Sequence, residues 1–478
     1  MSGMFDDFKE QVRSQANIVE IISEYVPLKK RGGSFWGCCP FHGEKTPSFS
    51  VTPDKNFFYC YGCHVGGDVF TFVMKMENCT FPEALKLLAN KLGIAVPEKE
   101  KTKAELEREK QAKQVIAANE LATRFFQACL TKTDYGIKAQ EYLTGRGITP
   151  EIIERFSIGV ALPNYNALLS ALGKRGCSAG LLVQAGLAVN YDRGPMDKFR
   201  GRVMIPIQDP RGHVVGFGGR ILEQNSQQMA KYMNTGETEW FNKRTLLFGM
   251  NVALKEIKKR RQAVIVEGYM DAISLHAAGI DWAVASMGTA FAQEQAKLLA
   301  RAADEVVFSY DSDAAGQRAT VRAVSIAKEA GLKVRVLIVP DGKDPDEFVR
   351  KHGKDAYLRL IETAVSGIEF QMQYVISQNN VSNLAGKVEA VSNILPFLLE
   401  CKNEIEVAQH IKTLAQRLTI DEGLIMSEYR KLSRKNDRGE AVSKWQIQPN
   451  VLSTEDLAEQ LLLYVILKNT DLALVYRD

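Results

Sequence analysis

The chain contains no apolar run long enough to cross a lipid bilayer, so we expect no membrane partner. Its longest tight apolar run, Leu461 to Leu467, is far shorter than a membrane-spanning helix and fits one face of a helix better. The N-terminus lacks a basic leader followed by a long apolar stretch, so no secretory signal is expected. Without export, the eight cysteines are expected in a reducing cytoplasm, where clustered cysteines bind metal more often than they form disulfides.

The charge has no strong excess of one sign, but it is unevenly distributed. The net charge is +4 over 478 residues, which indicates no partner by itself. Residues 195–262 hold 13 Lys/Arg against 6 Asp/Glu, whereas residues 263–350 hold 9 against 13. A basic segment beside an acidic one suits a metal site with a polyanionic substrate, although two unrelated surfaces would give the same counts.

The length exceeds that of a single hydrophobic core, so we expect roughly three domains. Two polar stretches predict the linkers, and changes in hydrophobic pattern predict the other boundaries. The expected segments are 1–97, a charged linker at 98–114 that is either a solvated helix or a tether, 115–258, 259–350, a helical segment at 351–434, a linker at 435–452, and 453–478.

The clearest secondary-structure pattern lies in residues 259–350, where apolar strands alternate with helices. Strands are expected at 263–268, 282–288, 305–311 and 333–341, with helices at about 270–278, 291–303 and 314–330. This order predicts a parallel sheet covered on both faces. Elsewhere we expect helices over Phe5–Tyr25 and Phe81–Leu92, and strands at 202–207 and 213–218.

Near the N-terminus, two pairs of metal-binding residues have the spacing of a zinc site. Cys39 and His42 form one pair, and Cys60 and Cys63 form the other. Four such ligands predict one closed, tetrahedral and structural zinc ion. Two alternatives remain open from spacing, because Cys38 could replace Cys39 and His64 could compete with Cys63. Nearby aromatic residues, with alternation over 57–61, could pack the small core or stack on single-stranded nucleic acid.

Six carboxylates follow three of the predicted strands. Glu267 lies at the carboxyl end of the first and Asp271 follows it, while Asp311 lies at the end of another and Asp313 follows it. The last strand precedes a loop with two more acids, Asp344 and Asp346. Acids gathered at strand ends repel one another unless a divalent cation holds them, and hard oxygen ligands favour two or more Mg²⁺ or Mn²⁺ ions. Individually, Asp271 and Asp346 could instead be helix-capping or turn residues.

Basic residues precede this acidic segment and are candidates for contacts with phosphates. Arg220 follows Gly216, Gly218 and Gly219, which we expect to let the backbone approach a phosphate closely. The full candidate set for nucleic acid or nucleotide binding is Arg146, Arg200, Arg202, Arg220, Lys231 and Lys243.

Taken together, these motifs resemble those of bacterial DNA primases of the DnaG type. The resemblance runs over about residues 1–435, through CPFHGEKTPSFSV, YCYGCHVGGD, KFRGRVMIPI, VVGFGGR, KYMNT, VEGYMD, SMGTA, YDSDAAG and GKDPDEF. It implies a multidomain α+β protein with an N-terminal zinc ribbon that touches template DNA. A central mixed α/β RNA polymerase domain containing a Toprim fold, and a C-terminal helical bundle, would follow.

The same resemblance implies roles for the candidate residues and partners for the chain. Glu267, Asp311 and Asp313 would hold the catalytic metals, and Asp271, Asp344 and Asp346 would add to the acidic site. The expected activity is synthesis of short RNA primers from ribonucleoside triphosphates on single-stranded DNA, in the cytoplasm at the replisome. Residues 453–478 would be the beginning of a domain that docks on the hexameric replicative helicase, so helicase binding by this short form is an open expectation.

Two other functions share parts of this pattern. A Toprim nuclease or topoisomerase would use the same glutamate and paired aspartates, although no setting for a nucleophilic tyrosine is evident. A non-catalytic, zinc-bearing DNA-binding scaffold would bind DNA without incorporating nucleotides and would not need so many acids.

Overall fold

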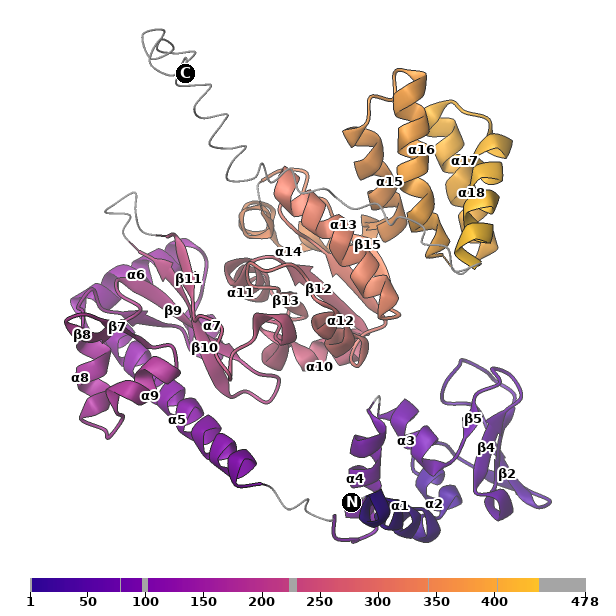
Figure 1. Ribbon diagram of the computed structural model, residues 1–478, viewed down its shortest axis with the longest axis horizontal. Coiled ribbons are helices and arrows are strands. Elements are labelled where there is room, and N and C mark those ends of the chain that lie inside the picture. The colour runs from indigo at the N-terminus through magenta and orange to yellow at the C-terminus, as the bar shows by residue number, and fades with distance from the viewer. Residues whose placement is uncertain are drawn as a thin grey trace, which may run out of the picture. The chain divides into compact units, whose positions relative to one another are not determined.

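The computed structural model describes residues 2–77, 79–96, 102–222, 230–342, 344–401 and 403–437 (Figure 1). The predictions for Leu461 to Leu467 and for 453–478 therefore lie outside the described residues. Contacts divide the chain into two compact units, the first made of residues 1–263, 268–289 and 293–304 and the second of the remainder. No helix in the described ranges has the length and apolar character needed to cross a membrane.

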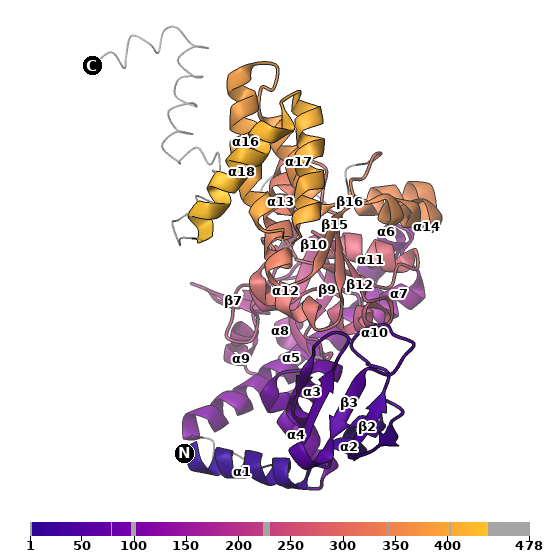
Figure 2. The same ribbon diagram turned by 90° about the vertical axis from the view of Figure 1, so that its right-hand side faces the viewer.

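Residues 2–96 combine a five-stranded antiparallel sheet with four α-helices. The strands pair in chain order, so that β2 and β3 run side by side (Figure 2). The elements are α1 (Ser2–Gln15), α2 (Ile18–Ser23), β1 (Lys29–Arg31), β2 (Ser34–Gly37), β3 (Phe49–Thr52), the 3₁₀ turn η1 (Pro53–Lys55), β4 (Phe57–Cys60), β5 (Gly66–Gly67), α3 (Val69–Met76) and α4 (Phe81–Lys91).

The single helix expected over Phe5–Tyr25 is two helices, which corrects the prediction. Asn17 has an extended backbone, and its side chain accepts hydrogen bonds from the backbone N–H groups of Val19 (3.1 Å) and Glu20 (3.4 Å). An asparagine in this position caps a new helix, so the chain changes direction there although the apolar periodicity continues.

The alternation predicted for residues 57–61 is present in β4 and the turn that follows it. Phe58 and Cys60 are fully buried, whereas Phe57 and Tyr61 are 42% and 62% exposed. The Tyr61 ring stacks on Trp36 at 5.8 Å between ring centroids. The small sheet therefore buries one aromatic face in its core and keeps the other at the surface.

In residues 102–260, a long helix packs against a four-stranded sheet of order β11-β10-β9-β6. The elements are α5 (Lys103–Lys132), α6 (Asp134–Gly145), α7 (Pro150–Arg155), β6 (Gly159–Ala161), α8 (Ala167–Gly173), α9 (Ala179–Gln184), the hairpin of β7 (Ala188–Tyr191) and β8 (Gly194–Asp197), β9 (Arg202–Gln208), β10 (Val214–Ile221), β11 (Tyr232–Asn234), the 3₁₀ turn η2 (Lys243–Thr245) and α10 (Met250–Arg260).

Helix α5 is amphipathic only in its second half. Val115, Ala118, Ala122 and Phe126 recur at helical spacing and are buried, and the Phe126 ring meets Phe217 of β10 edge to face at 5.5 Å. Most residues of the first half are exposed. Of the two structures considered for the charged linker, residues 103–114 therefore form the solvated helix.

The central segment forms a sheet of order β13-β12-β14-β15-β16. Its strands are β12 (Gln262–Val266), β13 (Ala283–Ala285), β14 (Glu305–Phe308), β15 (Lys333–Val336) and β16 (Val365–Ser366), and its helices are α11 (Tyr269–Ala277), α12 (Gln293–Ala300), α13 (Ala314–Glu329) and α14 (Pro345–Thr363). Strands β14 and β15 are parallel, as expected, whereas the short edge strand β16 is antiparallel to β15. The observed strands end before the acidic residues. Glu267, Asp311 and Asp313 lie in the loops that follow β12 and β14. Asp271 and Asp346 lie in the first turns of α11 and α14, and Asp344 is the N-cap of α14.

Four helices complete the described chain: α15 (Gly367–Gln378), α16 (Leu384–Leu399), α17 (Glu404–Leu418) and α18 (Glu422–Asp437). Helix α16 packs against the other three (Figure 1). Apolar residues at helical spacing, such as Ile394 and Leu398 of α16 and Ile411 and Leu414 of α17, form the buried interior. The expected multidomain fold, with a mixed α/β centre and a C-terminal helical bundle, is confirmed.

Candidate metal centres and a basic cluster

The structure brings the two predicted pairs of zinc ligands together. Cys39 and His42 lie in the loop between β2 and β3, Cys60 ends β4, and Cys63 lies in the turn that follows. Ligand atoms of all four lie within 4.8 Å of one another. The Cys39 Sγ to Cys63 Sγ distance is 3.8 Å, and Cys60 Sγ lies 3.7 Å from His42 Nδ1. A tetrahedron with Zn–S bonds of about 2.3 Å has edges of about 3.8 Å, so the four residues fit zinc.

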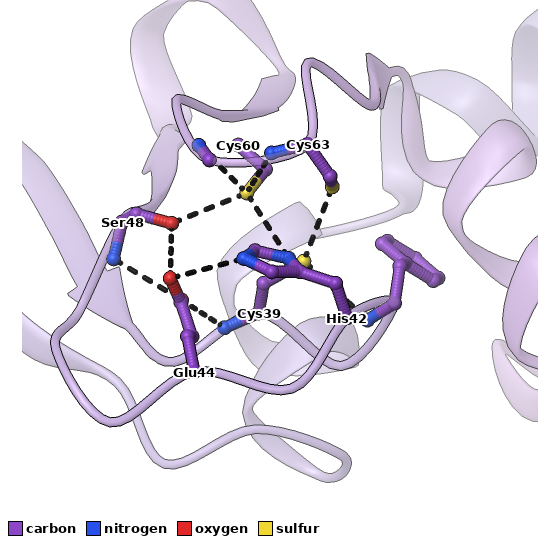
Figure 3. Close-up of polar contacts among 8 residues, drawn as sticks. Cys39, His42, Glu44, Ser48, Cys60 and Cys63 are labelled. Carbon is purple, nitrogen blue, oxygen red and sulfur yellow. Dashed lines mark hydrogen bonds and ion pairs between the residues drawn. The ribbon is translucent and has the colours of Figure 1, made fainter. Parts of the chain in front are cut away.

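Glu44 organises the ligands from outside the site (Figure 3). One carboxylate oxygen accepts a hydrogen bond from the Cys39 backbone N–H at 2.6 Å. The other accepts from the Ser48 hydroxyl at 2.5 Å and lies 3.3 Å from His42 Nε2. This contact leaves His42 Nδ1 as the nitrogen facing the sulfur atoms, because a carboxylate on one ring nitrogen fixes the tautomer and orientation of a metal-binding histidine. Sequence reasoning missed Glu44, and its place two residues after a ligand is a weak signal.

Backbone N–H groups prepare the sulfur atoms for metal binding. Gly62 and Cys63 donate to Cys60 Sγ at 3.3 and 3.4 Å, and Ser48 lies 3.2 Å from the same sulfur. Burial opposes ionisation of Cys60, but these hydrogen bonds outweigh it and lower its pKa to about 7. A thiolate is the form that binds metal, so the Cys60 environment favours the ligand form.

The two alternatives that the spacing left open point away from the metal set. Cys38 is exposed and is absent from the group of mutually close ligand atoms in the described chain. His64 Nδ1 lies 3.0 Å from the Tyr59 hydroxyl. The geometry therefore supports Cys39 and Cys63 as the ligands.

Three of the predicted carboxylates gather around Gly316 in the second unit. Glu267 Oε1 accepts a hydrogen bond from the Asp311 backbone N–H at 3.2 Å. Asp313 caps α13 and accepts from the Gly316 N–H at 2.7 Å. A Cβ atom on residue 316 would lie 2.3 Å from the Asp311 carbonyl oxygen and 2.8 Å from Glu267 Oε1, so the backbone contact requires glycine at this position. The loop after β12 and the loop after β14 thus meet at the start of α13.

The oxygen atoms of these three carboxylates do not converge on one point. In the described part of the chain, their oxygen atoms do not all approach within 4.8 Å of one another. Burial and the negative charges of Asp311 and Asp313 nevertheless raise the Glu267 pKa to about 7. The ionised form of Glu267 is therefore unfavourable without a counter-ion, and a divalent cation bound beside it would stabilise that form. Mg²⁺ usually keeps several waters and takes only one or two carboxylates, which suits an open arrangement.

The other three predicted acids are engaged with the backbone or a cation. Asp344 caps α14 by accepting from the Glu347 N–H at 2.8 Å, and buried Asp346 accepts from Arg350 at 2.9 and 3.4 Å. In the first unit, Asp271 in the first turn of α11 accepts from the Gly268 N–H at 3.1 Å. The capping alternative, which was raised for Asp271 and Asp346, thus describes Asp271. Neither the cap at Asp344 nor the Asp346–Arg350 ion pair was foreseen.

In the first unit, three of the predicted basic residues contact the same pair of tyrosine rings. The guanidinium of Arg220 lies 5.2 Å from the Tyr142 ring centroid and 5.1 Å from that of Tyr232. Arg146 lies over the same Tyr142 ring at 5.7 Å, and the Lys231 ammonium lies over Tyr232 at 5.6 Å. Sequence reasoning named the cations but missed both tyrosines.

Arg202 has a different environment from the one expected of a phosphate-binding residue. It is 1% exposed, and its guanidinium donates to the carbonyls of Gly219 (3.2 Å), Ala230 (2.8 Å) and Lys231 (3.4 Å). Burial lowers its pKa. The side chain therefore ties the ends of β10 and β11 together and does not face solvent.

The two remaining basic candidates lie nearer the surface. Arg200 donates to the Asp197 carbonyl at 2.5 Å and lies over the exposed Tyr165 ring at 4.9 Å. Lys243 is the first residue of η2. Its charge lies close enough to Lys198 to lower the pKa of that lysine, although burial of Lys198 is the larger cause.

The three glycines before Arg220 serve side-chain packing, which corrects their expected role at phosphates. A Cβ atom on Gly216 would lie 2.9 Å from the Phe241 ring, and one on Gly218 would lie 2.7 Å from the Tyr269 ring. On Gly219 it would lie 3.0 Å from Arg202 Cδ. Each glycine thus makes room for a large side chain that crosses β10.

Comparison with known families matches four successive parts of the chain. Residues 4–104 match the CHC2 zinc finger, and 125–254 match the N-terminal domain of the DNA primase catalytic core. Residues 264–349 match a Toprim-like family, and 368–423 match the DnaB-helicase binding domain of primase. The last match falls inside the helical bundle, whereas sequence reasoning placed the helicase-docking segment at 453–478.

Similar proteins and structures extend over most of the chain. The DNA primase of Clostridium acetobutylicum is 39% identical over 98% of this chain and 78% of its own length, and that of Geobacillus stearothermophilus is 34% identical over 98% and 79%. The crystal structure of the zinc-binding and RNA polymerase domains of Aquifex aeolicus primase is 31% identical, with a TM-score of 0.55, over 88% of this chain and 99% of that one. A DnaG primase catalytic domain bound to single-stranded DNA is 34% identical, with a TM-score of 0.58, over 66% and 99%.

Proposed function

The chain belongs to the bacterial DNA primases of the DnaG type, and from this we propose how its residues divide the work of primer synthesis. The protein is a DNA primase that makes RNA primers for replication. The observation that carries the proposal is the arrangement of Glu267, Asp311 and Asp313 around Gly316 in the Toprim-like segment. We propose these three as the principal ligands of the catalytic metals, with Asp271, Asp344 and Asp346 adding to the acidic site.

Bound Mg²⁺ or Mn²⁺ would supply positive charge at the reacting phosphate and lower the pKa of the attacking 3′-hydroxyl. Glu267 orients the loop after β14 by accepting from the Asp311 N–H. Asp313 holds the start of α13 against the same centre. No carboxylate then needs to act as a strong general base, since catalysis of phosphoryl transfer is mostly positioning and electrostatic stabilisation.

The basic residues complement this acidic centre. We propose that Arg146, Arg200, Arg220, Lys231 and Lys243 neutralise phosphates of the template and of incoming ribonucleoside triphosphates. Buried Arg202 contributes indirectly to phosphate binding. Its hydrogen bonds to the Ala230 and Lys231 carbonyls hold the backbone that carries Lys231.

The zinc ribbon supplies a separate surface for template. In the Trp36–Tyr61 stack, Tyr61 is exposed and Trp36 is half-buried. The stack lies beside β1, whose residues Lys29, Lys30 and Arg31 are all exposed. Exposed aromatic and basic residues together suit single-stranded DNA, because bases stack on rings and phosphates pair with cations. We propose that this face holds template, and that the tetrahedral zinc site keeps its loops in place.

Two further assignments follow from the matched families. The match over 368–423 supports contact with the hexameric replicative helicase through the helical bundle. A helicase exposes single-stranded template at the fork, so we propose the replisome on the bacterial nucleoid as the place of action, with an RNA primer as product.

Incorporation of labelled ribonucleotides on single-stranded DNA tests the assignment of the carboxylates. Asp311→Asn keeps the size of the side chain but removes a charge, and we expect it to lower primer synthesis by at least about a thousandfold. Its zinc content and far-ultraviolet circular dichroism should equal those of the wild type. Near-normal incorporation by this variant would contradict the role of the carboxylate centre.

The nuclease or topoisomerase alternative is not favoured by the comparisons, because the similar proteins and solved structures named above are primases. Incubating the protein with DNA and Mg²⁺ but no ribonucleotides separates the two activities. We expect intact DNA.

A further inference from the structure

Tyr142 on α6 contacts two cations that belong to different segments of the first unit. Arg146 follows it by four residues at the end of the same helix, and Arg220 comes from the far end of β10. Both guanidinium groups lie within 6 Å of the Tyr142 ring centroid. One aromatic ring therefore brings together two charges that would otherwise repel each other.

A second tyrosine contacts the Arg220 guanidinium. Its centre lies 5.1 Å from the Tyr232 ring centroid, and Arg220 Nη1 donates to the Tyr232 hydroxyl. Tyr232 in turn meets Tyr269 edge to face at 5.5 Å. Arg220 Nε is buried and has no hydrogen-bond acceptor among the described residues. The orientation of this guanidinium thus depends on the two rings and one hydroxyl, since Nε makes no hydrogen bond that would fix it.

Such contacts matter most for a residue that must present a planar, forked donor. A free arginine side chain loses substantial rotamer entropy when it binds a phosphate, and prior orientation removes part of that loss. Tyr142 is partly buried and Tyr232 is 40% exposed, so the cluster lies at the surface where a ligand can reach the guanidinium edges.

We propose that Tyr142 is a positioning residue that holds Arg146 and Arg220 ready to bind phosphate oxygens. The ligand is a phosphate of the nucleoside triphosphate or of the template backbone. This inference rests on the proposed phosphate-binding role of the two arginines, and it adds the residue that orients them.

Primer synthesis by full-length Tyr142→Leu tests the proposal through the Michaelis constant. Loss of the ring should raise KM for ribonucleoside triphosphate, or Kd for fluorescent single-stranded DNA, by about three- to thirtyfold while kcat changes little. A rise in KM alone identifies the triphosphate, and a rise in Kd alone identifies the template. Tyr142→Phe, which keeps the ring, should match the wild type in both. Unchanged KM and Kd in Tyr142→Leu, or equal damage in Tyr142→Phe, would overturn the proposal.

A double-mutant comparison separates positioning from a general loss of folded protein. Arg220→Lys keeps a charge but loses the planar fork, so adding Tyr142→Leu to it should raise KM or Kd less than Tyr142→Leu does alone. Fully additive effects of the two substitutions on KM or Kd would contradict the proposal. A lower kcat at unchanged KM and Kd would contradict it as well, because that result indicates only fewer folded molecules. Tyr191→Leu, at an exposed tyrosine in β7, is the matched control. If Arg220→Lys and Arg146→Lys both leave KM and Kd unchanged, the phosphate-binding role itself fails.

Discussion

The zinc centre and the carboxylate centre present metal ligands in opposite ways. At the zinc centre, sulfur and nitrogen atoms already lie 3.7 to 3.8 Å apart, and a surrounding set of N–H groups and Glu44 supports them. At the carboxylate centre, like charges stand apart around Gly316, and burial with mutual repulsion raises the pKa of Glu267. The first arrangement suits a permanent structural ion, and the second suits exchangeable ions that arrive with a charged substrate.

The largest effect that this comparison predicts is at a zinc ligand. Cys60→Ala should lose stoichiometric zinc and unfold residues 29–67, because structural zinc contributes roughly 10–16 kcal/mol to the folding of small zinc domains. Zinc analysis and amide hydrogen exchange would measure both losses. Cys38→Ala, at the exposed neighbour of a ligand, is the control and should keep its zinc. A Cys60→Ala variant that keeps its zinc and its protection from hydrogen exchange would contradict a structural role for this ion.

A smaller effect is expected when the support of the zinc ligands is removed and the ligands are kept. Glu44→Gln loses the negative charge beside His42 Nε2, so we expect zinc affinity to fall by about ten- to a hundredfold. Competition with a chromogenic chelator would measure it. Affinity equal to that of the wild type would show that the contact does not orient the histidine.

The corresponding glutamate-to-glutamine substitution at the carboxylate centre, Glu267→Gln, should stabilise the folded protein, whereas Glu44→Gln should weaken zinc binding. Without Mg²⁺, the raised pKa of Glu267 means that wild-type stability is lost as pH rises from about 4 to 7, whereas Glu267→Gln avoids this loss. After allowance for solvent screening, we expect the variant to be about 1–2 kcal/mol more stable at pH 8 and equal at pH 4. Hydrogen exchange of β12 and β14 amides measures the difference. A less stable variant at pH 8 would contradict the repulsion.

The smallest effect concerns the spacing between α14 and the loop after β14, which carries Asp311. The Tyr357 hydroxyl on α14 donates to buried Ser309 at 2.8 Å, two residues before Asp311. Tyr357→Phe should cost about 1 kcal/mol and raise the Mg²⁺ concentration for half-maximal activity by about two- to threefold, with kcat unchanged at saturation. A Mg²⁺ titration of primer synthesis provides the measurement. An unchanged titration would show that α14 does not set this spacing.

Features that depend on local spacing could be predicted from the sequence. The two pairs around Cys39 and Cys60 predicted a four-ligand site, and apolar strands followed by acids placed Glu267 and Asp311 in loops. Contacts between distant segments could not be predicted, which is why Tyr142 was missed beside Arg220. Glu44 was missed for another reason, since an acid two residues after a zinc ligand has no distinctive pattern. The burial of Arg202 and the crossing of β10 by Tyr269 over Gly218 are likewise tertiary features without a sequence pattern. The break at Asn17 was missed because the apolar periodicity continues past the residue that caps the second helix.

Manganese binding, followed by electron paramagnetic resonance at pH 8, tests most directly whether Glu267, Asp311 and Asp313 share a cation. We expect wild-type protein to bind Mn²⁺ and Asp311→Asn to lose at least one of these ions while retaining one zinc per chain. Unchanged Mn²⁺ stoichiometry and affinity in Asp311→Asn would contradict it.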